Sequence, residues 1–68
     1  MASREAARTA RDFLRETWGE TPGLLSIEAV ARKEGAHGVE IKLSSWSESW
    51  SKVPAEQDGV PIAVKVVT

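Results

Sequence analysis

The chain has 68 residues, of which 41% are hydrophobic and 28% are charged, with a formal net charge of −1. This length excludes two independent cores, and the composition is that of a folded domain, not of a disordered chain. The near-zero net charge also excludes the general attraction to nucleic acid that a strongly basic domain would have, so any such binding needs a local patch.

The first predicted element is an amphipathic helix from Ser3 to Trp18. Ser3 is a predicted N-cap, Glu5 lies in the first turn near the positive end of the helix dipole, and Gly19 is expected to end the helix in the left-handed conformation. The apolar positions recur every three or four residues, as in a helix with one buried face. This stripe consists of Ala6, Ala10, Phe13, Leu14 and Thr17, with Ala7 and Trp18 at its margins.

Two strands are predicted next, over residues 24–33 and 39–43, joined by the glycine-containing connection 34–38. The first strand places Leu25, Ile27, Ala29 and Ala31 on one face, and the second alternates apolar with charged residues. We expect the two strands to pair antiparallel and to form the surface on which the helix places Phe13 and Leu14. The sheet side of this core is expected to consist of Ile27, Ala29, Val39, Ile41 and Leu43.

The segment 44–51 contains only serine, tryptophan and glutamate, and its spacing fits helix and strand equally well. Residues 60–67 form the last predicted strand, with Pro61 at its start or on an edge. If residues 45–53 form a crossover helix, the last strand can lie parallel to the second strand; if they form a loop, a meander is expected. The predicted fold is therefore α+β, with an N-terminal helix on a three-stranded sheet in the order α-β-β-β and an optional short helix before the last strand.

The closing block of the chain carries one resemblance. Residues 53–66, which contain the run Asp-Gly-Val-Pro-Ile-x-Val-x-Val, cover about a fifth of the chain. The block is similar to the terminal strand of various small bacterial α+β domains of unassigned function. The resemblance implies a fold and a bacterial source, and it supplies no catalytic residue.

Two tryptophans are the first candidate binding residues. Trp46 and Trp50 are predicted to share one face, beside Ser47 and Ser49. Rigid aromatic rings among small hydroxyl residues are typical of adaptable recognition surfaces, which here would bind a protein partner. The alternative is that both rings cover an open side of the sheet.

Four arginines of the helix are the second candidate. Arg4, Arg8, Arg11 and Arg15 gather within about 40° of one line, roughly opposite the apolar stripe. Guanidinium groups bind phosphates and carboxylates in bidentate fashion, so this row is a candidate anion-binding site. The alternative is a solvated helix face whose field is weakened by the neighbouring Asp12 and Glu16.

Catalytic and metal chemistry find little support. His37 is the only histidine, lies in the predicted hairpin turn, and has no partner for a metal site. Glu28 and Glu40 share a predicted solvent face, without the burial that a catalytic acid and base require. No phosphate-binding loop or nucleophile elbow is present. We therefore expect no enzyme, no cofactor and no metal.

The sequence also indicates where the protein works and what it binds. No cysteine is present, which favours a cytoplasmic location, and no segment has the apolar run of a secretory signal or a membrane span. Because such a small core rarely supplies more than roughly 3–5 kcal/mol, association with a protein partner or with itself is expected. We thus predict an interaction or assembly module. The alternatives are a nucleic-acid binder that uses the arginines and tryptophan stacking, and a subunit of an enzyme with an intersubunit site.

Overall fold

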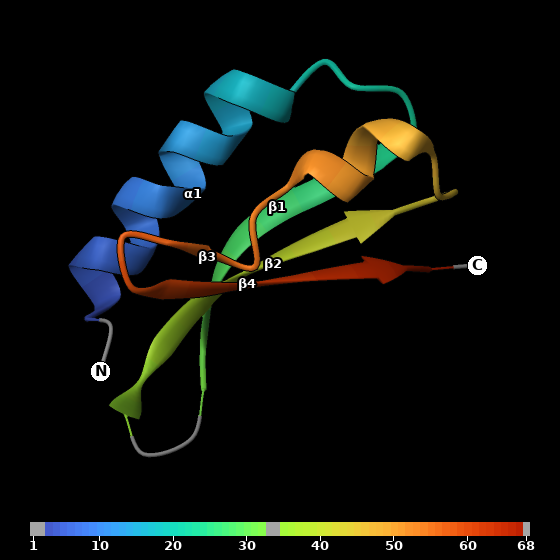
Figure 1. The fold of residues 1–68 in the computed structure, drawn as a ribbon. Helices are drawn as coiled ribbons and strands as arrows, with labels where there is room; N and C mark the ends of the chain where they lie inside the picture. Colours follow the sequence, from blue (N-terminus) through green and yellow to red (C-terminus); the bar gives the residue numbers. More distant parts are fainter. Residues whose placement is uncertain (1–2, 33–34, 68) are drawn as a thin grey trace.

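The computed structural model describes residues 3–32 and 35–67. One helix, α1 (Arg4–Trp18), packs on a four-stranded sheet of β1 (Leu24–Ala31), β2 (His37–Leu43), β3 (Glu56–Gln57) and β4 (Val60–Val66). A short 3₁₀ helix, η2 (Glu48–Lys52), lies between β2 and β3. Figure 1 shows α1 and η2 on the same side of the sheet. The predicted α+β class is confirmed, with one short strand more than expected.

The start of α1 follows the predicted capping pattern. Ser3 has an extended conformation, with φ −80° and ψ 166°, and its hydroxyl accepts a hydrogen bond of 3.1 Å from the amide of Ala6. Glu5 lies in the first turn. The end of the helix differs from the prediction, because Gly19 has φ −60°. The left-handed conformation occurs later, at Gly23 with φ 91°, where the chain turns into β1.

This cap gives a first testable prediction. We expect Ser3→Ala to lower the free energy of unfolding by about 1 kcal/mol, because it removes the acceptor for a helix-terminal amide. Thr9→Ala is the matched control: the Thr9 hydroxyl only donates to the Glu5 carbonyl within the helix, at an exposed position, and alanine is the better helix former. Urea denaturation followed by circular dichroism measures both changes. A loss in the control as large as that in the cap variant would contradict the assignment.

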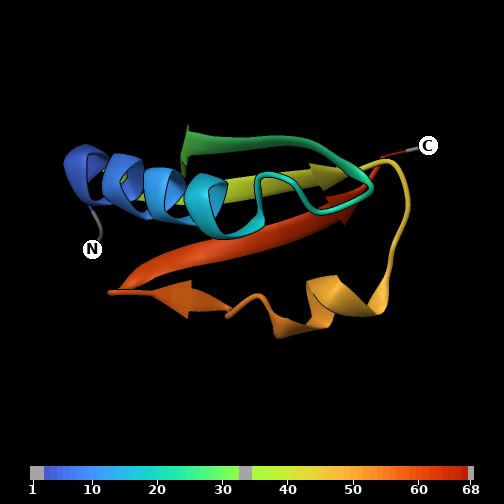
Figure 2. The ribbon, with the colours of Figure 1, turned by 90° about the horizontal axis from the view of Figure 1, so that it is seen from above.

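The sheet has the strand order β1-β2-β4-β3. β1 pairs antiparallel with β2, β4 pairs parallel with β2, and β3 pairs antiparallel with β4. The parallel pairing requires the chain to cross over between β2 and β4, and η2 lies on this connection. Of the two predicted alternatives, the crossover is therefore correct and the meander is wrong. Figure 2 shows this connection running beside β4.

The predicted hairpin forms with adjusted ends. His37 was predicted in the turn, but it begins β2 and pairs with Ala31. The amide of Arg32 donates a hydrogen bond of 2.7 Å to the carbonyl of Ala36. Residue 33, the predicted end of the first strand, and residue 34, the predicted start of the connection, lie outside the described residues. At the other end a register shift between Leu24 and Ser26 leaves Leu25 57% exposed. This irregularity is why Leu25 does not belong to the buried face of β1.

The core lies between α1, η2 and the sheet. The sheet residues Ile27, Val39, Ile41 and Leu43 are buried, as predicted, and Ala29 packs against them. The helix buries Ala10 and Leu14, as predicted, but not Phe13. Phe13 is 47% exposed, and the buried line of α1 consists of Ala7, Ala10 and Leu14, with Trp18 packed beside them. The small alanines let the N-terminal half of α1 approach the sheet closely, so the helix is rotated away from the predicted stripe.

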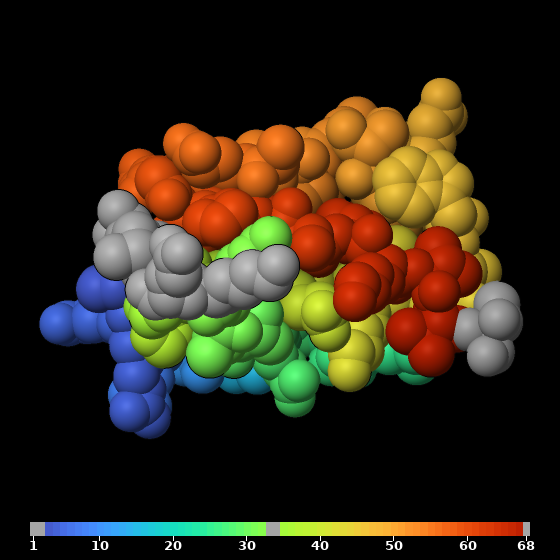
Figure 3. All heavy atoms as spheres, turned by 90° about the horizontal axis from the view of Figure 1, so that it is seen from below, coloured from blue at the N-terminus to red at the C-terminus, as the bar shows by residue number. Residues whose placement is uncertain are grey.

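The face of the sheet opposite α1 is seen in Figure 3. Glu28 and Glu40 are directly opposed there, as the strand pattern predicts. A carboxylate oxygen of Glu40 lies 3.7 Å from the Lys42 ammonium nitrogen, and the other lies 3.4 Å from that of Lys65. The first ion pair lies within β2, and the second links β2 to β4 across the parallel ladder. They give this face a mixed charge.

Candidate functional site: the basic groove beside β1

The two predicted tryptophans do not form a common surface. Trp50 is 1% exposed, and its indole nitrogen donates a hydrogen bond of 3.3 Å to the carbonyl of Pro22. Trp46 is 56% exposed and precedes η2. Ser47 is half-buried, whereas Ser49 is exposed. The expectation that both rings share one face is therefore wrong: one ring belongs to the core and the other faces solvent.

The four arginines lie on one flank of α1, beside the sheet. With about 100° of rotation per residue, their mean direction lies roughly 90° from the buried line of Ala7, Ala10 and Leu14. They were expected opposite the apolar stripe, and the rotation of the helix corrects this. Because α1 contacts both β1 and β2, one flank of the helix lies over β1, the outermost strand of the sheet. The arginines occupy that flank.

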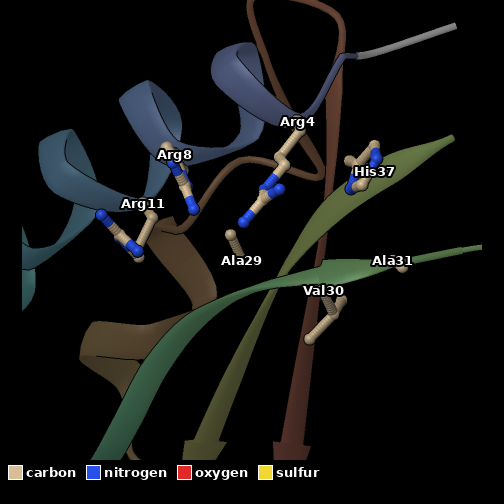
Figure 4. Close-up of a pocket in the computed structure, with 7 residues that line it drawn as sticks. All are labelled: Arg4, Arg8, Arg11, Ala29, Val30, Ala31 and His37. Atoms are coloured by element: carbon tan, nitrogen blue, oxygen red, sulfur yellow. The ribbon is translucent and has the colours of Figure 1, made fainter.

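Three of these arginines enclose a hollow together with β1. Arg4, Arg8 and Arg11 line it from the helix, and β1 and the start of β2 line it from below, around a volume of about 360 Å³. Figure 4 shows the side chains of Arg4 and Arg8 extending from α1 toward the strand. We call this hollow the basic groove, and its lining residues are Arg4, Arg8, Arg11, Ala29, Val30, Ala31 and His37.

The fourth arginine binds the edge of the sheet directly. The Nε of Arg15 donates a hydrogen bond of 3.0 Å to the carbonyl oxygen of Ile27. This carbonyl therefore points away from β2. Backbone groups of alternate residues in an antiparallel strand point to opposite sides. The amides and carbonyls of Ala29 and Ala31 must then also point outward, into the region beside the basic groove.

The charges around the groove are unevenly balanced. Arg11 forms an ion pair with Asp12, with 3.0 Å between Nη2 and Oδ1. Within residues 3–32 and 35–67, neither Arg4 nor Arg8 has a carboxylate within ion-pair distance. The acidic positions Glu5, Asp12 and Glu16 lie roughly 90° further round the helix, on its solvent side. The arginine row thus lies between the acidic row and the sheet, and the groove is positive although the whole chain is not.

Sequence patterns identified the arginines but not the rest of this site. Ala29, Ala31 and His37 have no chemical signature of binding, and their part depends on β1 being an edge strand. Strand order is set by the crossover through η2, which the pattern of residues 44–51 left open. The spacing of the arginines was the one feature of the sequence that indicated this site.

Neither a metal centre nor a membrane-spanning helix is found in the described part of the chain. No three histidine or acidic side chains of residues 3–32 and 35–67 are grouped so as to hold a metal ion. No described helix is both long and apolar enough to cross a bilayer.

Comparison with known proteins adds no identification to this geometry. No family model, no curated protein and no solved structure matches the chain. The similarity of residues 53–66 to small bacterial domains stays a prediction.

Proposed function

We propose that the protein is a protein-interaction module that binds an extended segment of a partner protein as an additional strand along the outer edge of β1. The observation that carries this proposal is the outward carbonyl of Ile27, which Arg15 binds. It identifies the residues whose backbone groups have no partner within the sheet. Strand addition uses such groups for affinity and alternate side chains for specificity.

The dimensions of β1 support this mode of binding. The strand has 8 residues, and β2 covers only one of its sides. By contrast β3 has only 2 residues, at the other edge of the sheet. β1 is therefore the longer edge strand of the sheet. Arg15 occupies the outward carbonyl of Ile27, and the outward groups of Ala29 and Ala31 beyond it form a template for pairing with another chain.

Nucleic-acid binding is less well supported by the geometry. That alternative combined the arginines, which would contact phosphates, with tryptophans, which would stack on bases. Trp50 is buried, and Trp46 follows the far end of β2 from His37. Since a strand rises about 3.3 Å per residue, the basic groove and Trp46 are separated by roughly 20 Å along β2. The two chemical functions do not converge on one surface.

A binding role in a reducing compartment is consistent with the composition. The chain has no cysteine, which supports a cytoplasmic location. The groove offers cationic and backbone groups, without a nucleophile paired to a base, which supports binding instead of catalysis. The enzyme-subunit alternative has no comparable observation in its favour.

Amide hydrogen exchange measured by NMR tests the proposed function. In the free protein we expect slow exchange at Glu28 and Val30, whose amides face β2, and fast exchange at Ala29 and Ala31. A capped peptide of alternating threonine and valine, as long as β1, should slow exchange at Ala29 and Ala31 when added in excess. Ala29→Pro should abolish this protection, because proline lacks the outward donor and is tolerated on edge strands.

Two outcomes of the exchange experiment would contradict strand addition at β1. If the outward amides stay fast at every peptide concentration, including with acidic and basic versions of the peptide, strand addition at β1 is wrong. The wild-type exchange pattern alone decides this, so the test does not depend on the folding of the proline variant. A protected Ala29 amide in the free protein would equally contradict an open edge.

A further inference from the structure

We infer that the segment bound by β1 is acidic at every second residue, with its carboxylates held by Arg4 and Arg8 in the basic groove. This inference rests on the proposed function and specifies the chemistry of the partner. It follows from where the added strand would lie. A strand hydrogen-bonded to Ala29 and Ala31 places alternate side chains on the face of the sheet that α1 covers. Those side chains enter the space beneath the arginines.

The spacing of the arginines matches the spacing of such side chains. A helix rises about 1.5 Å per residue, so Arg4 and Arg8 are about 6 Å apart along α1. Alternate residues of a strand are about 6.6 Å apart. Since α1 lies lengthwise over the strands (Figure 2), successive guanidinium groups can meet successive carboxylates. Guanidinium and carboxylate groups pair in bidentate fashion, which fixes register as well as charge.

The other side of the added strand meets a different surface. In Figure 4 the Val30 side chain points away from the arginines, on the opposite side of β1. Glu28 is on that side too, since it is two residues away on the same strand. Acidic residues there would lie beside Glu28 and gain no arginine. The structure therefore favours a segment whose acidic residues alternate with apolar or neutral ones.

The same charges disfavour a second copy of this chain as the occupant. Two β1 strands pairing antiparallel about a two-fold axis would extend the sheet with both helices on one face. The two rows of arginines would then face each other across the new pair of strands. Like charges opposed in this way are destabilising. An acidic segment of another protein would pair with the positive charges of the groove, whereas self-association through β1 would oppose them to each other.

Peptide binding to the full chain tests this inference. The probe is a capped peptide of alternating glutamate and valine, as long as β1, compared with a version in which glutamine replaces glutamate. We expect the acidic peptide to bind about tenfold more tightly at low salt, and this advantage to shrink as salt screens the exposed charges. Both peptides should protect the amides of Ala29 and Ala31.

Charge-matched variants locate the effect. The double variant Arg4→Gln with Arg8→Gln should remove most of the preference for the acidic peptide, while the neutral peptide binds as before. The control is Lys52→Gln with Lys65→Gln, which removes the same charge away from the groove and should keep the preference. Circular dichroism confirms that both variants fold, since glutamine retains good helix propensity.

The outcomes separate the two proposals. Equal binding of both peptides, with protected outward amides, overturns the acidic partner but leaves strand addition intact. Binding of the acidic peptide without protection at Ala29 overturns strand addition itself. An oligodeoxythymidylate of similar length serves as the competing probe: tighter binding than the acidic peptide, lost in the double arginine variant, would overturn the acidic partner in favour of nucleic acid.

Discussion

Replacing Trp50 with alanine is expected to unfold most of the protein at 25 °C. Trp50 is 1% exposed, and its indole nitrogen donates a hydrogen bond to the Pro22 carbonyl. This contact links η2 to the connection between α1 and β1. Removing such a buried ring costs about 3–5 kcal/mol. A domain of this size has a total stability of about the same magnitude. Far-ultraviolet circular dichroism with and without a stabilising osmolyte measures the loss.

Trp46→Ala is the matched control for this variant. It removes the same side chain four residues earlier, at a position that is 56% exposed. We expect its free energy of unfolding to change by about 0.5 kcal/mol or less, as for surface substitutions in general. Equal destabilisation by the two substitutions would contradict the separation of the rings into a core and a solvent-facing residue.

The second large effect is expected at adjacent positions of α1. Leu14→Ala should lower the free energy of unfolding by about 2–5 kcal/mol, because Leu14 is 0% exposed and faces the sheet. Phe13→Ala, which removes a larger side chain, should cost less than about 1 kcal/mol, since Phe13 is 47% exposed.

Urea unfolding of both helix variants, measured under identical conditions, determines how α1 is rotated on the sheet. A greater loss at Phe13 than at Leu14 would restore the apolar stripe predicted from the sequence. It would also move the arginine row away from β1, and both proposals about the basic groove would then lose their geometric basis.

The error at Phe13 shows where sequence patterns stop being informative. The predicted stripe included both Phe13 and Leu14, and helical spacing alone does not decide whether its centre lies nearer the Ala6 side or the Ala7 side of the helix. The choice between them depends on how closely the helix can approach the strands. That distance is set by side chains far away in the sequence, including Trp50, which fills the space at the other end of the core.

The strands were more predictable because their periodicity is local. Ile27, Val39, Ile41 and Leu43 alternate with polar residues, and a shift of one residue would bury charges. The two tryptophans were not predictable, since a spacing of four fits several structures and says nothing about which ring packs inside. The binding edge depended on strand order, which is a property of the whole chain. Hence only the arginine half of the basic groove could be recognised beforehand.

The parallel ladder between β2 and β4 has a consequence for how the protein is made. The helix and the β1–β2 hairpin are local structures that can form as soon as they leave the ribosome. β2 stays without its second neighbour until the crossover and β4 have followed. During that interval Val39, Ile41 and Leu43 expose an apolar strand on the nascent chain, which is the condition under which wrong pairing and aggregation occur. Emergence of residues 44–66 from the ribosome is therefore the vulnerable period in the biogenesis of this protein.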